Sequence, residues 1–363
     1  MRVLILSANT GGGHNAAAVA LSEQLEKLNI DYEIADTLAF ISERVSDFIS
    51  WGHSYVYRKF PKLFGWGYRF EERHPPRFIY EQCSKGAESL HQFIEEKQFD
   101  VVICVHVFSG MMMTEVGERY GSTIPSYFVS TDYTCSPGVA EMKVEKCIIP
   151  HRMLLGEFVR CGVHADKMMA TGIPVRRLFY EQEEKSVARE ALGLPQDRTV
   201  VLVSFGSMGC GKLEKNVSTL IKGTDGDICY VVLCGNNTKT YELLAPYENE
   251  RLRVVSFTKE IQRYMTAADI YITKPGGLTT SEAIVKQLPM ILINAVPGCE
   301  TRNFHFLVQM GVAVGAKNWK QAAMTVNQMV EKPELREEMI KAMKLFSPDN
   351  AAERICRQII RAE

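Results

Sequence analysis

Short apolar runs alternate with amphipathic stretches along most of the chain. The apolar runs are residues 3–6, 99–105, 126–130, 146–150, 199–204, 228–234, 252–257 and 270–273. Runs without polar alternation predict parallel strands buried on both faces, and the stretches between them predict connecting helices. The expected helices include 15–28, 84–97, 154–161, 180–190 and a final one at 348–363. This order predicts an α/β protein with doubly wound parallel sheets.

The pattern of strand, glycine-rich turn and helix occurs twice, first from residue 3 and again from residue 199. Because single cores seldom exceed roughly 250 residues, a chain of 363 residues is long enough for two domains. We predict an N-terminal domain at 1–177, a C-terminal domain at 178–347 and a C-terminal helix at 348–363 that packs back towards the N-terminal domain. The hinge is expected around the charged helix 180–190. Two such domains, facing each other across a cleft, suit an enzyme that takes one ligand from each side.

Charge and cysteine content narrow the possible functions. Lys and Arg number 42 against 43 Asp and Glu, which argues against a general nucleic-acid binder. The ten cysteines show no CxxC pairing, so we expect reduced core thiols in a cytoplasmic protein and no structural zinc. The first residues lack the pattern of a signal peptide, and no apolar run approaches the roughly 18 residues of a membrane span. Any membrane role is therefore expected to be peripheral.

Residues 51–80 differ in composition from the rest of the chain. They contain ten aromatic residues and six Lys or Arg against two Glu. Interleaved aromatic and basic residues suit an anionic membrane interface, where the rings lie at headgroup level. The alternative is an aromatic helical hairpin packed on its own domain, with its basic groups reaching solvent. On the membrane hypothesis, the residues expected to contact the membrane or acceptor are Trp51, Arg58, Lys59, Phe64 and Trp66.

Polar residues stand at the carboxyl ends of several expected strands. Three glycines and His14 follow the first strand, so the backbone at Gly12 and Gly13 can approach a ligand and a titratable group lies at the helix start. His106 and Asp132 follow two later strands. A lone histidine such as His106 is more often a hydrogen-bonded structural residue, whereas Asp132 fits a structural or a catalytic role equally well.

The stretch 273–303 contains two such loops. It runs from a Pro-Gly-Gly turn through an amphipathic helix and an apolar strand to a second Pro-Gly turn with Glu300 and Asn303. Parallel strands bring both loops to one sheet edge, where a helix N-terminus offers N–H groups to an anion. We therefore predict a nucleotide-sugar diphosphate site in this stretch.

The chain resembles glycosyltransferase family 28 of the two-domain GT-B fold, and within it the branch of diacylglycerol glycosyltransferases and monogalactosyldiacylglycerol synthases. The resemblance covers essentially the whole chain. It rests on the motifs SANTGGGHNAAAVAL (7–21), STDYTCSP (130–137), TGIPV (171–175), VSFGSMG (203–209), TKPGGLTTSEAI (273–284) and PGCETRN (297–303). The first motif and the last two are specific in combination.

The resemblance implies an inverting transfer of a hexose from a UDP-sugar to a lipid, most often diacylglycerol, at the cytoplasmic face of a membrane. His14 would be the general base, with Asp132 as a second catalytic residue, and no metal or other cofactor would be needed. Glu282 would bind the ribose hydroxyls and Thr258 would lie at the uracil. The positions implied for donor binding are Gly12, Gly13, Arg176, Ser207, Thr258, Gly276, Gly277, Leu278, Thr279, Glu282, Cys299, Glu300 and Asn303.

Two departures from the family pattern concern the sugar and the acceptor. Cys299 stands where the family commonly has Gln, and a thiol is a poor partner for sugar hydroxyls, so Glu300 is expected to take that role. Ser136 stands where many relatives have a histidine close to the Thr-Asp pair. Three alternatives remain: a transferase to a polyprenyl-diphosphate-linked acceptor, a UDP-sugar epimerase on the same fold, and a UDP-sugar-binding module without turnover.

Overall fold

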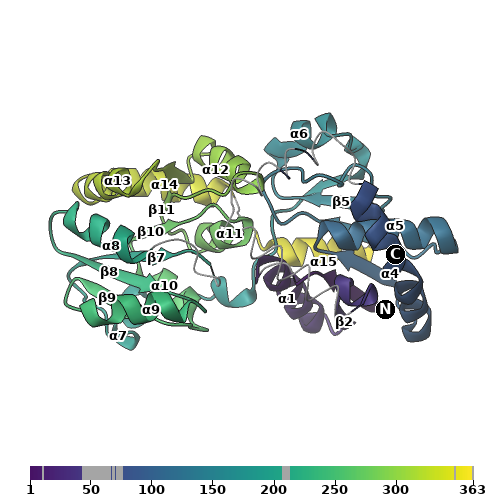
Figure 1. The fold of residues 1–363 in the computed structure, drawn as a ribbon, viewed down its shortest axis with the longest axis horizontal. Coiled ribbons are helices and arrows are strands. Elements are labelled where there is room, and N and C mark those ends of the chain that lie inside the picture. Colours follow the sequence, from purple (N-terminus) through teal and green to yellow (C-terminus); the bar gives the residue numbers. More distant parts are fainter. Residues whose placement is uncertain are drawn as a thin grey trace. The chain divides into compact units, whose positions relative to one another are not determined.

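The computed structural model describes residues 1–9, 12–42, 67, 70, 77–206, 213–346 and 349–361. They form two compact units (Figure 1). Unit 1 comprises Met1–Arg177, Val296–Arg302 and Asp349–Glu363, and unit 2 comprises Leu178–Ala295 and Asn303–Pro348. Each unit contains one six-stranded sheet with parallel neighbours. The predicted α/β class with two doubly wound sheets is therefore confirmed.

The sheet of unit 1 has the strand order β2-β1-β3-β4-β5-β6. Its strands are β1 (Arg2–Ser7), β2 (Asp31–Asp36), β3 (Val101–Cys104), β4 (Ser126–Val129), β5 (Lys146–Ile149) and β6 (Met168–Ala170). Among the described residues, the α-helices of this unit are α1 (Gly12–Lys27), α4 (Arg77–Lys97), α5 (Val107–Tyr120), α6 (Leu155–Arg160) and α15 (Ala351–Arg361). The central strands β1 and β3 are buried almost throughout, as expected for apolar parallel strands covered on both faces.

The sheet of unit 2 has the order β12-β11-β10-β7-β8-β9. Its strands are β7 (Thr199–Ser204), β8 (Ile228–Leu233), β9 (Leu252–Val255), β10 (Ile270–Thr273), β11 (Met290–Leu292) and β12 (Ala313–Gly315). The helices are α7 (Lys185–Ala191), α8 (Leu213–Lys222), α9 (Thr238–Leu244), α10 (Ile261–Ala267), α11 (Gly277–Val285), α13 (Trp319–Glu331) and α14 (Pro333–Phe346), while α12 (Cys299–Gln309) begins in unit 1 and ends in unit 2. Numbered along the chain, these six strands have the 3-2-1-4-5-6 order of dinucleotide-binding sheets.

Three edge strands were not predicted from the sequence. β2 reads DYEIAD and has no buried residue, while β6 and β12 have three residues each. An edge strand is hydrogen-bonded on one side only and can be short or charged, so it lacks the apolar run of an interior strand. The prediction of a helix at 180–190 was partly wrong, because α7 begins at Lys185. The residues before it make tertiary contacts instead, such as the ion pair of Glu183 with Arg263 at 3.0 Å.

The C-terminal helix α15 packs against α1 within unit 1 (Figure 1). The Arg354 guanidinium donates to the carbonyl of Ala170 at the end of β6, at 3.2 Å. Close packing at the start of α15 also explains the glycine of the TGIPV motif. Gly172 has a positive φ of 107°, and a Cβ added there would lie 3.1 Å from that of Ala351.

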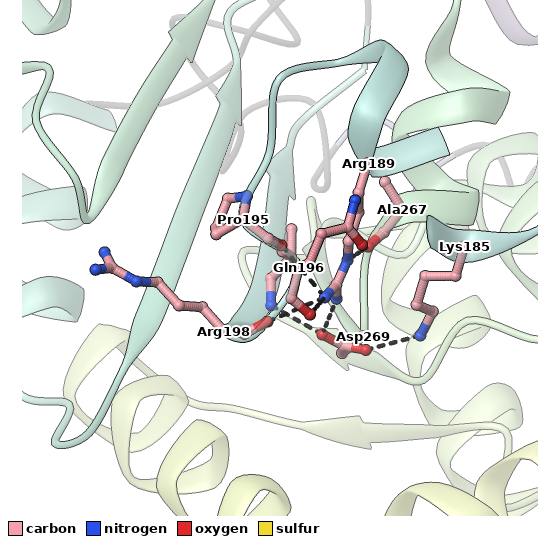
Figure 2. A network of polar contacts seen from close by, with 8 residues as sticks. Lys185, Arg189, Pro195, Gln196, Arg198, Ala267 and Asp269 are labelled. Atoms are coloured by element: carbon pink, nitrogen blue, oxygen red, sulfur yellow. Dashed lines mark hydrogen bonds and ion pairs between the residues drawn. The ribbon is translucent and has the colours of Figure 1, made fainter. Parts of the chain in front are cut away.

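A buried ion pair links α7 to the sheet of unit 2 (Figure 2). The Arg189 guanidinium lies 2.6 Å from Asp269 and also donates to four main-chain carbonyls, those of Ala267, Pro195, Gln196 and Arg198. The carboxylate of Asp269 accepts in addition from the N–H of Val200 on β7 and from Lys185. Burial raises the pKa of Asp269, but the Lys185 and Arg189 charges and the Val200 hydrogen bond outweigh it, so this pKa lies below its ordinary 3.8.

We predict that Asp269→Asn lowers the free energy of unfolding by about 3–5 kcal/mol, because it leaves the buried Arg189 charge without its counter-charge. Urea unfolding followed by circular dichroism at neutral pH measures this. The lowered pKa of Asp269 means that its stabilisation is present above pH 3.8 and is lost as the pH falls through the folded-state value. The gap between the two proteins therefore closes in acid.

Asp227→Asn is the matched control. Asp227 pairs with Arg198 at 2.9 Å, but its side chain is 63% exposed, so its loss should change stability by no more than about 1 kcal/mol. Equal losses in the two variants would show that burial of the Asp269 pair does not matter.

Candidate active site

The first cluster of candidate residues lies at the carboxyl ends of the strands of unit 1. The chain order of the sheet reverses between β1 and β3, and ligands of open α/β sheets bind at such a switch point. His14 stands in the first turn of α1, after β1. Val105 and His106 follow β3, and Thr131 and Asp132 follow β4. The topology thus brings together His14, His106 and Asp132, the polar residues that the sequence placed after three of the predicted strands.

A chain of side-chain hydrogen bonds braces the turn that carries His14. The Ser7 hydroxyl donates to Asn15 at 2.7 Å, Asn15 donates to Asn9 at 2.8 Å, and Asn9 donates to Asp36 at 2.9 Å. These bonds connect the ends of β1 and β2 to the first turn of α1. The helix begins at Gly12, three residues before the predicted start at Asn15, so Gly12 and Gly13 belong to its first turn.

The imidazole of His14 is held through one of its ring nitrogens. Nδ1 lies 3.0 Å from the carbonyl oxygen of Val105 and 3.0 Å from the hydroxyl of Thr131. A carbonyl oxygen can only accept, so Nδ1 carries the hydrogen of the neutral ring. The lone pair is then on Nε2, which makes this nitrogen the one that can accept a proton.

The surroundings of His14 set its protonation state. Burial lowers the pKa of the imidazole, while the charge of Asp132 and the hydrogen bond to Val105 raise it. Burial is the largest of these effects, and the pKa lies below its ordinary value of 6.5. At neutral pH the ring is therefore uncharged and able to act as a general base.

His106 has a structural task, in line with the more frequent role expected for a lone histidine. Its Nδ1 accepts a hydrogen bond from the N–H of Phe108 at 3.0 Å and so caps the N-terminus of α5. Its ring meets that of His14 edge to face, with centroids 4.5 Å apart. His106 thus forms one wall of the His14 environment.

The second cluster lies at the switch point of the sheet in unit 2, between β7 and β10. The Pro-Gly-Gly turn follows β10, and α11 begins at Gly277 with Gly276 as its N-cap. The first N–H groups of an α-helix have no partner within the helix, so the N–H groups of Gly277, Leu278 and Thr279 are arranged for an anion. Glu282, on the same helix, is half-buried.

Asn303 and Thr258 make local hydrogen bonds in unit 2. Asn303 is fully buried and its amide donates to the carbonyl of Pro275 at 3.0 Å, which holds the Pro-Gly-Gly turn in place. The Thr258 hydroxyl accepts from the N–H of Glu260 at 3.0 Å. The predicted contacts of these two residues with a sugar and with uracil stay predictions.

The second Pro-Gly turn belongs to unit 1 up to Arg302. Glu300 is 4% exposed, and its carboxylate accepts from the N–H of Val296 at 3.0 Å. Cys299 is half-buried at the start of α12, and Arg176 is half-buried near the end of the first segment of unit 1. Their expected roles at the donor also stay predictions.

Several predicted residues lie outside the described part of the chain. These are Ser207 and the expected membrane or acceptor contacts Trp51, Arg58, Lys59, Phe64 and Trp66. Among the described residues, no cluster of His, Cys, Asp and Glu side chains is arranged to hold a metal ion. No helix in the same part of the chain is both long enough and apolar enough to cross a membrane.

Comparison with known proteins identifies the class of enzyme. Residues 14–175 match the family model of monogalactosyldiacylglycerol (MGDG) synthase, and residues 186–346 match that of glycosyl transferases group 1. A processive diacylglycerol beta-glucosyltransferase of Bacillus licheniformis is 29% identical, with 99% of this chain and 94% of the relative covered. The chain is a glycosyltransferase and is similar to these enzymes over its whole length. This confirms the resemblance seen in the sequence motifs.

Solved structures show that this glycosyltransferase has the GT-B fold. MurG of Acinetobacter baumannii superposes with a TM-score of 0.64 at 14% identity, covering 99% of each chain. The glycosyltransferase of kitacinnamycin gives a TM-score of 0.70 at 13% identity, covering 99% of this chain and 98% of the other. At such low identity the likeness concerns the fold alone.

Sequence reasoning missed Val105 and Thr131, which contact Nδ1 of His14. The contribution of Val105 is its main-chain carbonyl, and no sequence pattern indicates which carbonyl faces a ring. Thr131 did carry a signal, because it is a polar residue directly before Asp132 at a strand end.

We predict that kcat/KM for glycosyl transfer falls on the acid side with a pKa below 6.5, because protonated His14 cannot accept the acceptor proton. Asp132→Asn should move this acid limb to lower pH, since the Asp132 charge favours protonation of His14. Initial rates measured across the pH range test this. Asp31→Asn, an exposed carboxylate on β2, is the control and should leave the limb in place. A limb that moves upward in Asp132→Asn would contradict the assignment.

Proposed function

We propose that the protein transfers a hexose from a UDP-sugar to a lipid acceptor of the diacylglycerol class, with inversion at the anomeric carbon. The observation that carries the proposal is the state of His14: an imidazole anchored through Nδ1, uncharged at neutral pH, with Nε2 as its base. The acceptor class is supported by the full-length similarity to a processive diacylglycerol beta-glucosyltransferase.

In the proposed reaction, Nε2 of His14 removes the proton of the acceptor hydroxyl. The acceptor oxygen forms a bond to the anomeric carbon, and the bond from that carbon to the diphosphate oxygen breaks. UDP leaves with the bonding electrons. Asp132 stabilises the imidazolium that forms, since its carboxylate already favours protonation of the ring.

In this proposal the donor is held by groups of the motif TKPGGLTTSEAI (273–284) and by Arg176. The N–H groups of Gly276 to Thr279 and the dipole of α11 suit the diphosphate, and the carboxylate of Glu282 suits two vicinal ribose hydroxyls. Arg176 would add a positive charge near the phosphates. In this proposal dipoles and an arginine stabilise the leaving group, so the chemistry needs no metal ion.

We also propose that the protein binds peripherally to an anionic membrane. Within the described residues, the segment at α6 exposes three apolar side chains: Met153 (64%), Val159 (49%) and Leu155 (37%). Arg152 and Arg160 are exposed beside them. Apolar side chains next to arginines suit the boundary between acyl chains and anionic headgroups.

We predict that the purified protein, given a panel of UDP-sugars and diacylglycerol in mixed micelles, yields a glycolipid detected by mass spectrometry.

His14→Ala should lower kcat at least about 100-fold with little change in UDP affinity by calorimetry, because it removes only the base. Glu282→Ala should raise KM for the UDP-sugar and weaken UDP binding about 10-fold, since it removes a hydrogen bond to the nucleotide. EDTA should leave the wild-type rate unchanged.

Other outcomes would point to the alternative functions. Product with a polyprenyl-diphosphate acceptor and none with diacylglycerol would replace the acceptor class. Conversion of the UDP-sugar without any acceptor would indicate an epimerase, and UDP binding without turnover would indicate a binding module. Full activity of His14→Ala would overturn the proposed mechanism.

We further predict that the double variant Met153→Ser with Val159→Ser binds vesicles containing anionic phospholipid at least about 10-fold more weakly, because less apolar surface enters the interface. Vesicle sedimentation measures the partitioning. Leu345→Ser on α14 is the matched control, since Leu345 is 84% exposed and belongs to unit 2. Equal losses in both proteins, or none in the double variant, would contradict a specific role of α6.

A further inference from the structure

The loop from Thr131 to Cys135 carries Asp132 and is anchored at both ends. At its start, the Thr131 hydroxyl lies 3.0 Å from Nδ1 of His14, and the Ser130 hydroxyl donates to the carbonyl of Asp132 at 3.2 Å. At its end, Thr134 and Cys135 are buried. The position of Asp132 relative to His14 therefore depends on what holds this second end.

A single carboxylate holds it. Oε1 of Glu157, on α6, accepts from the Thr134 hydroxyl at 2.5 Å and from the N–H of Cys135 at 3.0 Å. Both donors are buried, so without Glu157 two polar groups would lose an acceptor inside the protein. Such groups are costly to leave unsatisfied, and the loop would shift to satisfy them.

Arg302 links the same carboxylate to a second motif. Its guanidinium lies 3.9 Å from Oε1 of Glu157 and 3.4 Å from the Thr134 hydroxyl. Arg302 belongs to the motif PGCETRN, and Thr134 belongs to the motif STDYTCSP. Two segments far apart in the sequence, each singled out for function, therefore meet at Glu157, which neither motif contains.

We propose that Glu157 is a positioning residue of the transfer reaction: its carboxylate holds the Thr131–Cys135 loop and thereby keeps Asp132 beside His14. This inference rests on the proposed roles of His14 and Asp132. In this role Glu157 acts through the loop and not on the reacting atoms.

Titration of the His14 ring by NMR, in protein with isotope-labelled histidine, tests the inference without relying on turnover. The His14 signal is assigned with His14→Gln. Asp132→Asn should lower the pKa of His14. Glu157→Ala should also lower this pKa, by about half a pH unit or more, because the loop that carries Asp132 is released. Glu157→Gln should have a smaller effect, since its amide oxygen can still accept from Thr134 or Cys135. Glu141→Ala, which removes an exposed carboxylate before β5, should have none.

Thr134→Val separates positioning from a direct effect of the Glu157 charge. It removes one bond to the carboxylate without changing any charge, and it should also lower the pKa of His14. If Glu157→Ala does not fold, Glu157→Gln and Thr134→Val carry the test. The double variant Glu157→Gln with Thr134→Val should lower the pKa of His14 by less than the sum of the two single effects, because both substitutions act on one contact.

Three results would overturn the inference. The first is a shift in Asp132→Asn with none in Glu157→Ala, which leaves the proposed function intact. The second is a lower His14 pKa in Glu157→Ala with an unchanged His14 pKa in Thr134→Val. The third is an unchanged His14 pKa in both Asp132→Asn and Glu157→Ala. If all three variants shift the pKa but the wild-type protein transfers no sugar, the positioning role stands and the proposed function fails.

Discussion

The carboxyl ends of parallel strands lie at one common edge of their sheet, and this constraint places the polar groups of the two candidate clusters. In unit 1 the strand order reverses between β1 and β3, and His14, His106 and Asp132 lie in the segments that directly follow neighbouring strands at that point. In unit 2 the reversal lies between β7 and β10, where the Pro-Gly-Gly turn leads into α11. Both units therefore have their candidate functional residues at the position where doubly wound sheets commonly bind ligands.

The protonation state of His14 follows from a competition between burial and charge. Burial favours the neutral ring, and Asp132 favours the charged one, with burial the stronger effect. The carbonyl of Val105 decides which nitrogen holds the hydrogen. The ring is fixed through its Nδ1, and the loop that carries Asp132 is held by the carboxylate of Glu157.

Many polar side chains near the two clusters hold loops rather than face solvent. Asn303 holds the Pro-Gly-Gly turn through Pro275, Glu300 holds the second Pro-Gly turn through Val296, and Glu157 holds the loop of Asp132. Each accepts from or donates to a main-chain group that would otherwise lack a partner. Glycine leaves the backbone of these loops free to adopt many conformations, and the buried polar side chains fix one of them.

The sequence by itself determined the interior strands, the two doubly wound units and the candidates His14, Asp132 and Gly276 to Thr279. These features depend on local patterns: apolar runs such as VLIL in β1 mark buried strands, and glycine or proline beside polar residues marks the loops that follow. The edge strands β2, β6 and β12 were not predicted from the sequence. Each pairs with a neighbouring strand on one side only, so its residues need not form the apolar run of a buried strand. Only the tertiary structure revealed the Val105 carbonyl, the hydroxyl of Thr131 and the carboxylate of Glu157 as the groups that hold the His14 ring and the loop of Asp132. Their partners lie 91, 117 and 23 residues away along the chain, a separation that no local pattern records.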